Sequence, residues 1–318
     1  MISIMSTLLN LKNKEKPEDF YVREILDLDF EENGKFFYYL LKKKNLNTLD
    51  VVNILKKRFK IKEVGYCGNK DKVAVTEQYI SLNRKINEVY ERNFSLRFVG
   101  RGNKRLSLGD NAGNYFKIIV KDFKNKINNF DFIENYFDDQ RFSKNNYLVG
   151  KNLIKKNFKE ACNLLGLEIN GNDYVNALKK IDKKILLLYI HAFQSYLFNE
   201  YLSGMLSNHN HFEADYSLGK MIFLKQKIKN FKIPLVSFDT KDKIYDKILK
   251  KEGVKLSDFI IKQFPELINE TTYRDAFVDI KALKISFLKN GVELEFELPK
   301  GSYATIVVKK LFSRSLRF

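Results

Sequence analysis

The stretch 47-NTLDVVNILKKRFKIKEVGYCGNKDKVAVTEQ-78 contains the signals of a helix, a tight turn and a strand, in that order. Apolar residues recur at helical spacing over 47–59, and Asn47 or Thr48 can cap such a helix. Two glycines then favour a turn, and from Val73 onward apolar residues alternate with small or polar ones, as in a strand. A helix followed so closely by a strand indicates a fold that mixes α and β structure.

Further strand signals lie on both sides of this stretch. Alternation with a period of two recurs in 94-FSLRF-98, in 116-FKIIVK-121 and most regularly in 292-VELEFEL-298, while residues 36–44 suit a strand or the start of a helix. In the segment 292–298 the apolar residues and the glutamates fall on opposite faces. We therefore expect a sheet with one face toward a core and one face toward water.

The texture of the sequence changes between about residues 150 and 270, where helical periodicity replaces alternation. The longest apolar segment, 185-ILLLYIHAFQSYLFNEYLSGML-206, belongs to this region. Strand signals resume after about residue 280. We therefore predict a discontinuous domain formed by residues 1–150 and 271–318, with a second domain, residues 151–270, inserted into it.

Charge is the strongest signal in the composition. The chain has 57 Lys and Arg against 39 Asp and Glu, a formal net charge of +18, and its lysines form clusters such as 42–44 and 225–229. Such a field favours a polyanion, because each lysine or arginine that meets a phosphate releases counterions. The chain also has 17 Tyr and 27 Phe, and aromatic side chains stack on unpaired bases, so RNA is the expected partner.

Several classes of protein are disfavoured by what the sequence lacks. Cys67 and Cys162 have no partners at metal-ligand spacing, and the three histidines have no cysteines or carboxylates placed to complete a zinc site, so we expect no metal. The phosphate loop of nucleotide hydrolases, the G-x-G-x-x-G dinucleotide motif and the G-x-S-x-G elbow are absent. The apolar runs are too short to span a bilayer and no signal peptide is evident, so we expect a cytoplasmic protein.

One carboxylate stands out in the turn of the opening stretch. Asp71 lies between Lys70 and Lys72, where the glycine turn meets the strand. An aspartate is ionised at neutral pH, and a nearby ammonium group favours the ionised form further. A negative charge in a basic protein that binds phosphates is therefore a candidate for chemistry.

The chain resembles the TruD family of tRNA pseudouridine synthases in several dispersed motifs. The motifs occur in the family's order: 14-KEKPEDFYVREI-25, 45-NLNT-48, 65-GYCGNKDKVAVTEQ-78, 109-GDNAGNYFKIIV-120, 135-NYFDDQRF-142, 192-AFQSYLFN-199 and 298-LPKGSYATIVVKKL-311. The pattern G-x-K-D-x-x-A-x-T-x-Q together with N-Y-F-x-x-Q-R-F is specific. Asp138 and Ser143 depart from the family pattern, which usually has glycine at both positions.

The resemblance implies an α+β fold and an isomerase. In this family a pseudouridine synthase catalytic domain, built on a mixed and largely antiparallel sheet, carries an inserted α/β TRUD domain. The implied reaction breaks the bond between N1 and C1′ of a uridine in tRNA, uridine-13 by resemblance, rotates the uracil and joins its C5 to C1′. It implies no cofactor, no metal and no obligatory protein partner.

The resemblance also assigns residues of this chain to roles. Asp71 corresponds to the family's essential aspartate, as a nucleophile or as a base toward C2′, and the residues leave both routes open. Lys14 is a candidate charge partner of that carboxylate, and Lys70 is a second candidate that also lies near enough to meet the substrate.

For the flipped base, the resemblance points to Phe137, whose ring would stack on the uracil. Asn135 would hydrogen-bond either the uracil edge or the loop backbone. Gln78, Arg141 and Thr305 are candidates for shaping the pocket or for meeting phosphate.

Two other functions have to be weighed. A non-catalytic RNA-binding or RNA-folding protein could keep the same scaffold, but a groove that only binds phosphates gains nothing from the charge of Asp71. A glycoside hydrolase would need a second acid about 5–10 Å from Asp71, and neither Glu24 nor Glu77 suits that role.

Overall fold

The computed structural model describes residues 16–121, 127 and 130–313, and the chain divides into two compact units. The first unit comprises Met1–Asp131 with Asp279–Ala304, and the second comprises Phe132–Val278 with Thr305–Phe318. Residues 132–150, 271–278 and 305–313, which the sequence pattern assigns to the discontinuous domain, belong to the second unit. The short strands at residues 132–134 and 277–279, where the chain enters and leaves this unit, pair with each other. That the two units are a catalytic and a TRUD domain stays a prediction.

The first unit is built on a nine-stranded sheet in the order β14-β15-β7-β1-β4-β2-β6-β5, with β3 paired to β4. The pairing of β1 with β4 is parallel, and all other pairs described in this sheet are antiparallel. The expected mixed, largely antiparallel sheet is therefore confirmed. The elements of this unit are η2 (Pro17–Asp19), β1 (Phe20–Ile25), β2 (Phe36–Lys44), α2 (Thr48–Phe59), β3 (Val64–Tyr66), β4 (Val75–Leu82), β5 (Val89–Tyr90), β6 (Phe94–Gly102), β7 (Gly113–Lys121), β14 (Lys281–Leu288) and β15 (Gly291–Pro299).

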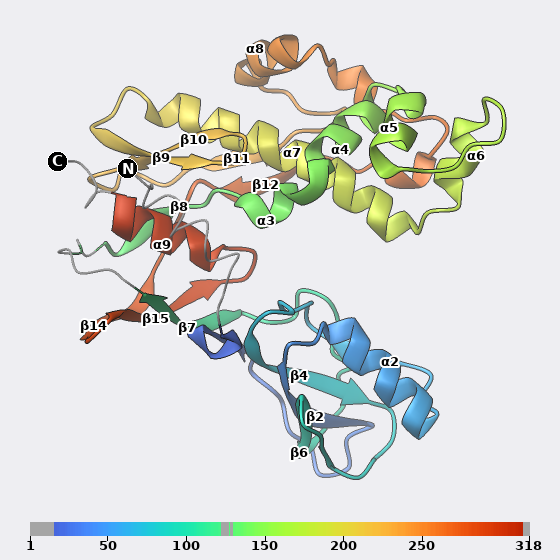
Figure 1. The fold of residues 1–318 in the computed structure, drawn as a ribbon, viewed down its shortest axis with the longest axis vertical. Coiled ribbons are helices and arrows are strands. Elements are labelled where there is room, and N and C mark those ends of the chain that lie inside the picture. The colour runs from blue at the N-terminus through green and yellow to red at the C-terminus, as the bar shows by residue number, and fades with distance from the viewer. Residues whose placement is uncertain (1–15, 122–126, 128–129, 314–318) are drawn as a thin grey trace. The chain divides into compact units, whose positions relative to one another are not determined.

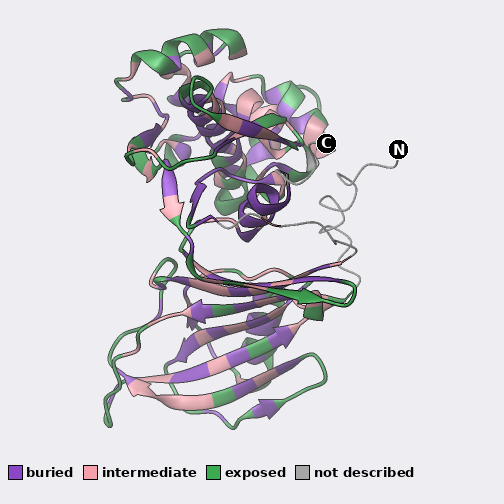
Figure 2. Ribbon diagram, turned by 90° about the vertical axis from the view of Figure 1, so that its left-hand side faces the viewer, coloured by how far each residue is buried: buried purple, intermediate pink, exposed green. Residues whose placement is uncertain are grey.

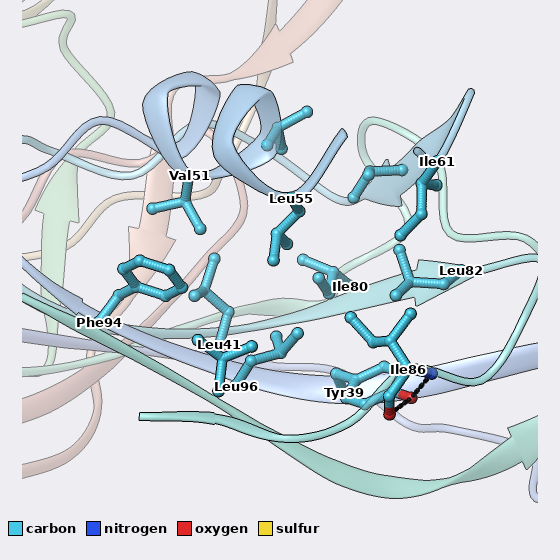
Figure 3. Close-up of a cluster of buried hydrophobic side chains, with 13 residues drawn as sticks. Tyr39, Leu41, Val51, Leu55, Ile61, Ile80, Leu82, Ile86, Phe94 and Leu96 are labelled. Carbon is cyan, nitrogen blue, oxygen red and sulfur yellow. Dashed lines mark hydrogen bonds between the residues drawn. The ribbon is translucent and has the colours of Figure 1, made fainter. Parts of the chain in front are cut away.

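The helix α2 forms where the apolar spacing predicts it. Asn47 is the N-cap, and the Asp50 carboxylate accepts hydrogen bonds from both the main-chain and the side-chain nitrogen of Asn47. Val51 and Leu55 point from α2 toward apolar side chains of β2, β4 and β6, as Figure 3 shows. This packing holds α2 against the sheet. The loop that carries Asp71 follows shortly after, between β3 and β4.

Alternation along β15 follows the sequence prediction closely. Val292, Leu294, Phe296 and Leu298 are buried, while the glutamates between them are partly exposed. Figure 2 shows the same change between buried and more exposed residues along the other strands of this sheet. The glutamate face also carries charge pairs between strands: Lys117 of the neighbouring β7 forms an ion pair with Glu293.

The second unit is organised around α7, which packs against α4, α8 and β11 (Figure 1). Three two-stranded pairs accompany the helices: β9 with β10, β11 with β12, and β8 with β13. The elements are β8 (Phe132–Glu134), α3 (Asp139–Phe142), η3 (Ser143–Asn145), α4 (Asn146–Ile154), α5 (Phe158–Leu165), α6 (Tyr174–Lys179), α7 (Lys183–Leu206), β9 (His211–Tyr216), β10 (Gly219–Leu224), β11 (Lys232–Leu235), α8 (Lys243–Glu252), η4 (Leu256–Phe259), η5 (Pro265–Leu267), β12 (Thr272–Asp275), β13 (Phe277–Asp279) and α9 (Ala304–Ser313). No helix in the described ranges is long and apolar enough to cross a membrane.

Candidate active site

Asp71 lies on the loop that joins β3 to β4 in the first unit, and its side chain is partly buried. The strand β4 pairs with β1, β2 and β3, so this loop enters the sheet at a strand with neighbours on both sides. A loop anchored in this way can hold a side chain more accurately than a free surface loop.

Lys43 of β2 holds the main chain of the Asp71 loop through hydrogen bonds. Its ammonium group donates hydrogen bonds to the carbonyl oxygens of Leu46 at 2.7 Å, of Asp71 at 2.9 Å and of Lys70 at 3.3 Å. Lys43 is only 1% exposed, although it belongs to the lysine cluster 42–44 that the composition suggests for polyanion binding. On β2 its side chain follows Tyr39 and Leu41 on the buried face, which explains the difference from its neighbours.

A closed circuit of hydrogen bonds fixes the same loop from the side of α2. The hydroxyl of Thr48 accepts from the main-chain nitrogen of Lys70 at 3.0 Å and donates to the side-chain oxygen of Gln78 at 2.8 Å. The amide nitrogen of Gln78 in turn donates to the carbonyl oxygen of Gly68 at 3.1 Å. Gln78 is buried and binds the main chain of the loop that carries Asp71, and its role in shaping a pocket stays a prediction.

Lys70 ties the loop to two further strands. Its ammonium group donates to a carboxylate oxygen of Glu24 on β1 and to the side-chain oxygen of Asn114 on β7, both at 2.9 Å. The other oxygen of Glu24 accepts from the main-chain nitrogen of Tyr79 at 3.0 Å. One oxygen of Glu24 is thus engaged by the Asp71 loop and the other by β4, while Glu77 pairs with Lys42.

Three further possibilities near Asp71 are a charge partner, a reactive thiol and a metal site. Lys14 lies outside the described residues. Cys67, next to the loop, is a free and buried thiol, and burial raises its pKa to about 12, which keeps it protonated and unreactive. Among the described residues, no three of His, Cys, Asp and Glu gather as metal ligands would.

Phe137 lies in the second unit, in a segment that runs from the end of β8 to the start of α3. Its ring is 5% exposed and meets Phe198 of α7 edge to face, with 5.4 Å between the ring centroids. The guanidinium carbon of Arg274 lies 4.2 Å from the centroid of the same ring. Cation and aromatic contacts of this kind favour a fixed ring orientation.

Asn135 is joined to β12 by its main chain and its side chain. Its side-chain nitrogen donates to the carbonyl oxygen of Asp275 at 3.0 Å, and its main-chain nitrogen donates to Ala276 at 2.8 Å. Arg274 donates to both the main-chain and the side-chain oxygen of Asn135. The Asn135 side chain thus binds the main chain of β12, and a contact with a uracil edge stays a prediction.

Asn199 of α7 holds the main chain of Phe137 from both sides. Its side-chain oxygen accepts from the Phe137 nitrogen at 3.0 Å, and its side-chain nitrogen donates to the Phe137 carbonyl oxygen at 2.8 Å. Arg141 of α3 places its guanidinium carbon 5.4 Å from the Phe137 ring centroid, and its buried Nε has no hydrogen-bond partner among the described residues. Thr305, partly buried, is the second residue of α9.

Two lysines of α9 pair with carboxylates on either side of Phe137. Lys310 contacts Glu134 at 3.0 Å, and Lys309 contacts both Asp138 and Asp139. Burial by itself would lower the pKa of Lys309, but the two aspartate charges outweigh that effect and raise it. Burial likewise opposes ionisation of Asp139, and the Lys309 charge nevertheless lowers the pKa of that carboxyl.

The structure thus brings together Asp71, Lys70 and Gln78 in one unit, and Asn135, Phe137 and Arg141 in the other. Sequence reasoning did not single out Lys43, Arg274 or Asn199. For two of them a signal existed: Lys43 has the same strand parity as Tyr39 and Leu41, and an asparagine inside an apolar helix such as α7 needs a buried partner. Arg274 sits in a short strand without a pattern that marks it.

Known proteins are similar to this chain over almost its whole length. The family model described as tRNA pseudouridine synthase D (TruD) matches residues 9–169, 164–233 and 235–311. A curated relative from Aquifex aeolicus, named tRNA pseudouridine synthase D, is 30% identical over 385 aligned positions, which cover 97% of this chain and 100% of the relative. A second relative, from Nanoarchaeum equitans and named "Probable tRNA pseudouridine synthase D", is 31% identical over 97% of this chain and 100% of its own length.

A solved structure supports the fold independently. The crystal structure of the "Putative tRNA pseudouridine synthase D (TruD)" from Methanosarcina mazei superposes with a TM-score of 0.66, at 22% identity, over 94% of this chain and 92% of the other. Fold and relatives together define a class of RNA-modifying isomerases, the pseudouridine synthases. Within that class, the chain belongs to the TruD family.

Proposed function

We propose that this chain converts a uridine of tRNA, uridine-13 by family resemblance, to pseudouridine, with Asp71 as the catalytic carboxylate. The observation that carries the proposal is the anchoring of the Asp71 loop: Lys43 and Thr48 bind its main chain, and Lys70 joins it to β1 and β7. A solvated loop aspartate needs no such support. A carboxylate that must meet a sugar carbon or its proton does need it, because misplacement by about 1 Å can cost about 100-fold in rate.

The chemistry requires one ionised oxygen and a base that can turn. The bond between N1 and C1′ breaks, the uracil rotates, and a bond forms between C5 and C1′; C5 loses a proton and N1 gains one, so the product is an isomer. Asp71 serves this sequence either as a nucleophile at C1′ or as a base at C2′. Phe137 is proposed to stack on the uracil, and Gln78, Arg141 and Thr305 to shape the pocket or meet phosphate.

The proposed roles of two other residues follow from their contacts. Lys70 acts on the reaction through the position of the loop, since its ammonium group is engaged by Glu24 and Asn114. Lys14 remains a proposed charge partner of Asp71. The net charge of +18 supports a tRNA substrate, because phosphate contacts supply most of the affinity of such proteins.

The test is to incubate the purified protein with unmodified total tRNA and to map new pseudouridines along the RNA. A single new site at position 13 is expected. Asp71→Asn should abolish product formation and keep tRNA binding within about threefold, because it removes the ionised oxygen while leaving the basic surface intact.

A matched control is Asp27→Asn, which removes a negative charge from an exposed position of the same unit. It should leave both binding and product formation unchanged. Easily measured activity of Asp71→Asn would remove Asp71 from the catalytic role, and absence of pseudouridine with the unaltered protein would reject the proposed function.

A further inference from the structure

The helix α9, red in Figure 1, presents two consecutive lysines to one short segment of the second unit. Lys310 and Glu134 form a pair in which both side chains are fully buried, and Glu134 also accepts from the main-chain nitrogen of Leu224 at 2.8 Å. The Lys310 nitrogen lies 3.4 Å from the ring centroid of Phe132. The segment is thus fixed at its start, just before Asn135 and Phe137.

Lys309 fixes the same segment at its other end. Its nitrogen donates to a carboxylate oxygen of Asp138 and, at 2.8 Å, to one of Asp139. The second oxygen of Asp139 accepts from the main-chain nitrogen of Ser217 at 2.7 Å. Asp138 is buried, and without a cation a buried carboxylate at this position would be strongly unfavourable.

We propose that Lys309 and Lys310 of α9 are positioning residues that hold Phe137 and Asn135 in place for the base, Lys310 through Glu134 and Lys309 through Asp138 and Asp139. The inference rests on the proposed function, because it concerns the segment that would carry the base. Neither lysine touches the substrate in this proposal.

Helix geometry explains how two adjacent lysines reach carboxylates on both sides of Phe137. Successive residues of a helix point about 100° apart, so their long side chains can reach two separate points of one extended segment. Phe137 lies between these points, and Asn199 holds its main chain from the side of α7. The main chain of a segment held at three points cannot shift without breaking a buried polar contact, and the ring of Phe137 is carried on that main chain.

Lys309 offers the clearer experiment, because its two carboxylate partners can be neutralised as well. Lys309→Met should lower the single-turnover rate of pseudouridine formation by about 10- to 100-fold, with tRNA binding within about threefold of the unaltered protein. Lys309→Arg keeps a cation of similar reach and should restore most of the rate. A thermal melt for each variant reports the folded fraction at the assay temperature.

The triple variant Lys309→Met, Asp138→Asn, Asp139→Asn separates positioning from stability. It removes the unpaired buried charges that Lys309→Met leaves behind, so its melting temperature should recover toward that of the unaltered protein. If the pairs position the segment, the rate should stay low. Recovery of the rate in parallel with the melting temperature would overturn the proposal.

Lys151→Met is the control within the same unit, since Lys151 pairs with Glu252 and joins α4 to α8. It should lower the melting temperature without changing the rate of the folded protein. An active unaltered protein with an equally active Lys309→Met would overturn the positioning role alone. No pseudouridine from the unaltered protein would instead reject the proposed function, and this inference with it.

Discussion

Lys43 shows how a buried residue of one strand can hold the loop that carries Asp71, the proposed catalytic carboxylate. Its ammonium group meets three main-chain carbonyl oxygens, two of which belong to Lys70 and Asp71. Hydrogen bonds from a buried lysine to carbonyl oxygens fix main-chain positions, because each of these acceptors needs a donor once it is removed from water. The direction of the Asp71 side chain therefore depends on a residue of another strand.

Lys43→Met keeps the length of the side chain and removes the three donors. Each buried acceptor that loses its donor costs about 1–3 kcal/mol, so we expect a loss of unfolding free energy of a few kcal/mol. The single-turnover rate should fall at least about tenfold with little change in tRNA affinity. Rapid-quench assays at saturating protein measure this rate.

Lys42→Met is the control, because Lys42 is the exposed neighbour on β2 and its pair with Glu77 is a surface ion pair. Such pairs contribute about 0–1 kcal/mol, so its stability and its rate at saturation should stay close to those of the unaltered protein. Equal rates for the two variants would show that Lys43 does not position the loop.

Phe137 can be tested by a change that separates aromatic stacking from packing. Phe137→Leu keeps an apolar side chain but loses the ring contacts with Phe198 and Arg274, so it should cost about 1–3 kcal/mol of unfolding free energy. It removes the flat ring, and stacking on a base contributes about 1–3 kcal/mol, so turnover should fall by about 10-fold or more. Phe193→Leu changes a buried ring of α7 and should keep the rate. A similar fall in both variants would assign Phe137 to the core alone.

At the scale of residues, a local pattern can point to a candidate such as Asp71, but not to the residues that hold it in place. Asp71 could be singled out because a carboxylate between two lysines is locally conspicuous. Lys70 looked equally available, yet its ammonium group is engaged by Glu24 and Asn114, residues far away in the chain. Such partners depend on which strands become neighbours, and no local pattern contains that information.

At the scale of elements, α2 connects local sequence to the position of the site. Its buried side chains pack on β2, β4 and β6, and Thr48 at its first position takes part in the circuit under the Asp71 loop. A helix that loses its packing would release one anchor of the loop. The packing of α2 on the sheet therefore contributes to the position of the Asp71 loop.

Neighbouring residues of α2 allow a direct comparison of buried and exposed positions. Leu55 is fully buried and Ile54 is 40% exposed. Leu55→Ala should lower the unfolding free energy by about 2–5 kcal/mol, because it leaves a cavity in the core, whereas Ile54→Ala should change it by about 0.5 kcal/mol or less. Urea unfolding followed by circular dichroism measures both, since the chain has no tryptophan. Equal losses would contradict the packing described for α2.

Elements with a clear period could be predicted from sequence, and the order of strands could not. The apolar spacing of residues 47–59 and the alternation of residues 292–298 correspond to α2 and β15. The pattern of residues 36–44 suits a strand or the start of a helix, and the structure makes this segment β2, with Lys43 on its buried face. The parallel pairing of β1 with β4 joins segments separated by three other elements, so it depends on tertiary packing.

At the scale of the whole molecule, charge is distributed over both units while the candidate residues are few. Most lysines serve neither the Asp71 loop nor the segment around Phe137. A net charge of +18 therefore has to be understood as a property of the whole surface, which attracts the phosphates of an RNA before any specific contact forms.

This view predicts that affinity and chemistry respond differently to salt. If about 6–10 phosphates are neutralised, the affinity for tRNA should fall by about 10³- to 10⁵-fold between 50 and 200 mM salt. The single-turnover rate at saturating protein should stay nearly constant over the same range, because the buried contacts that hold Asp71 are only weakly screened. Asp71→Asn should show the same slope of binding as the unaltered protein.

Excess EDTA completes the experiment, with the fold of the tRNA checked separately at each salt concentration. We expect the rate to persist, because the proposed reaction uses a carboxylate and an aromatic ring. A flat dependence of binding on salt would contradict the electrostatic account of tRNA affinity. Loss of turnover in EDTA with folded tRNA would show that a metal ion takes part in the reaction, and the role proposed for Asp71 would then have to be derived again around that ion.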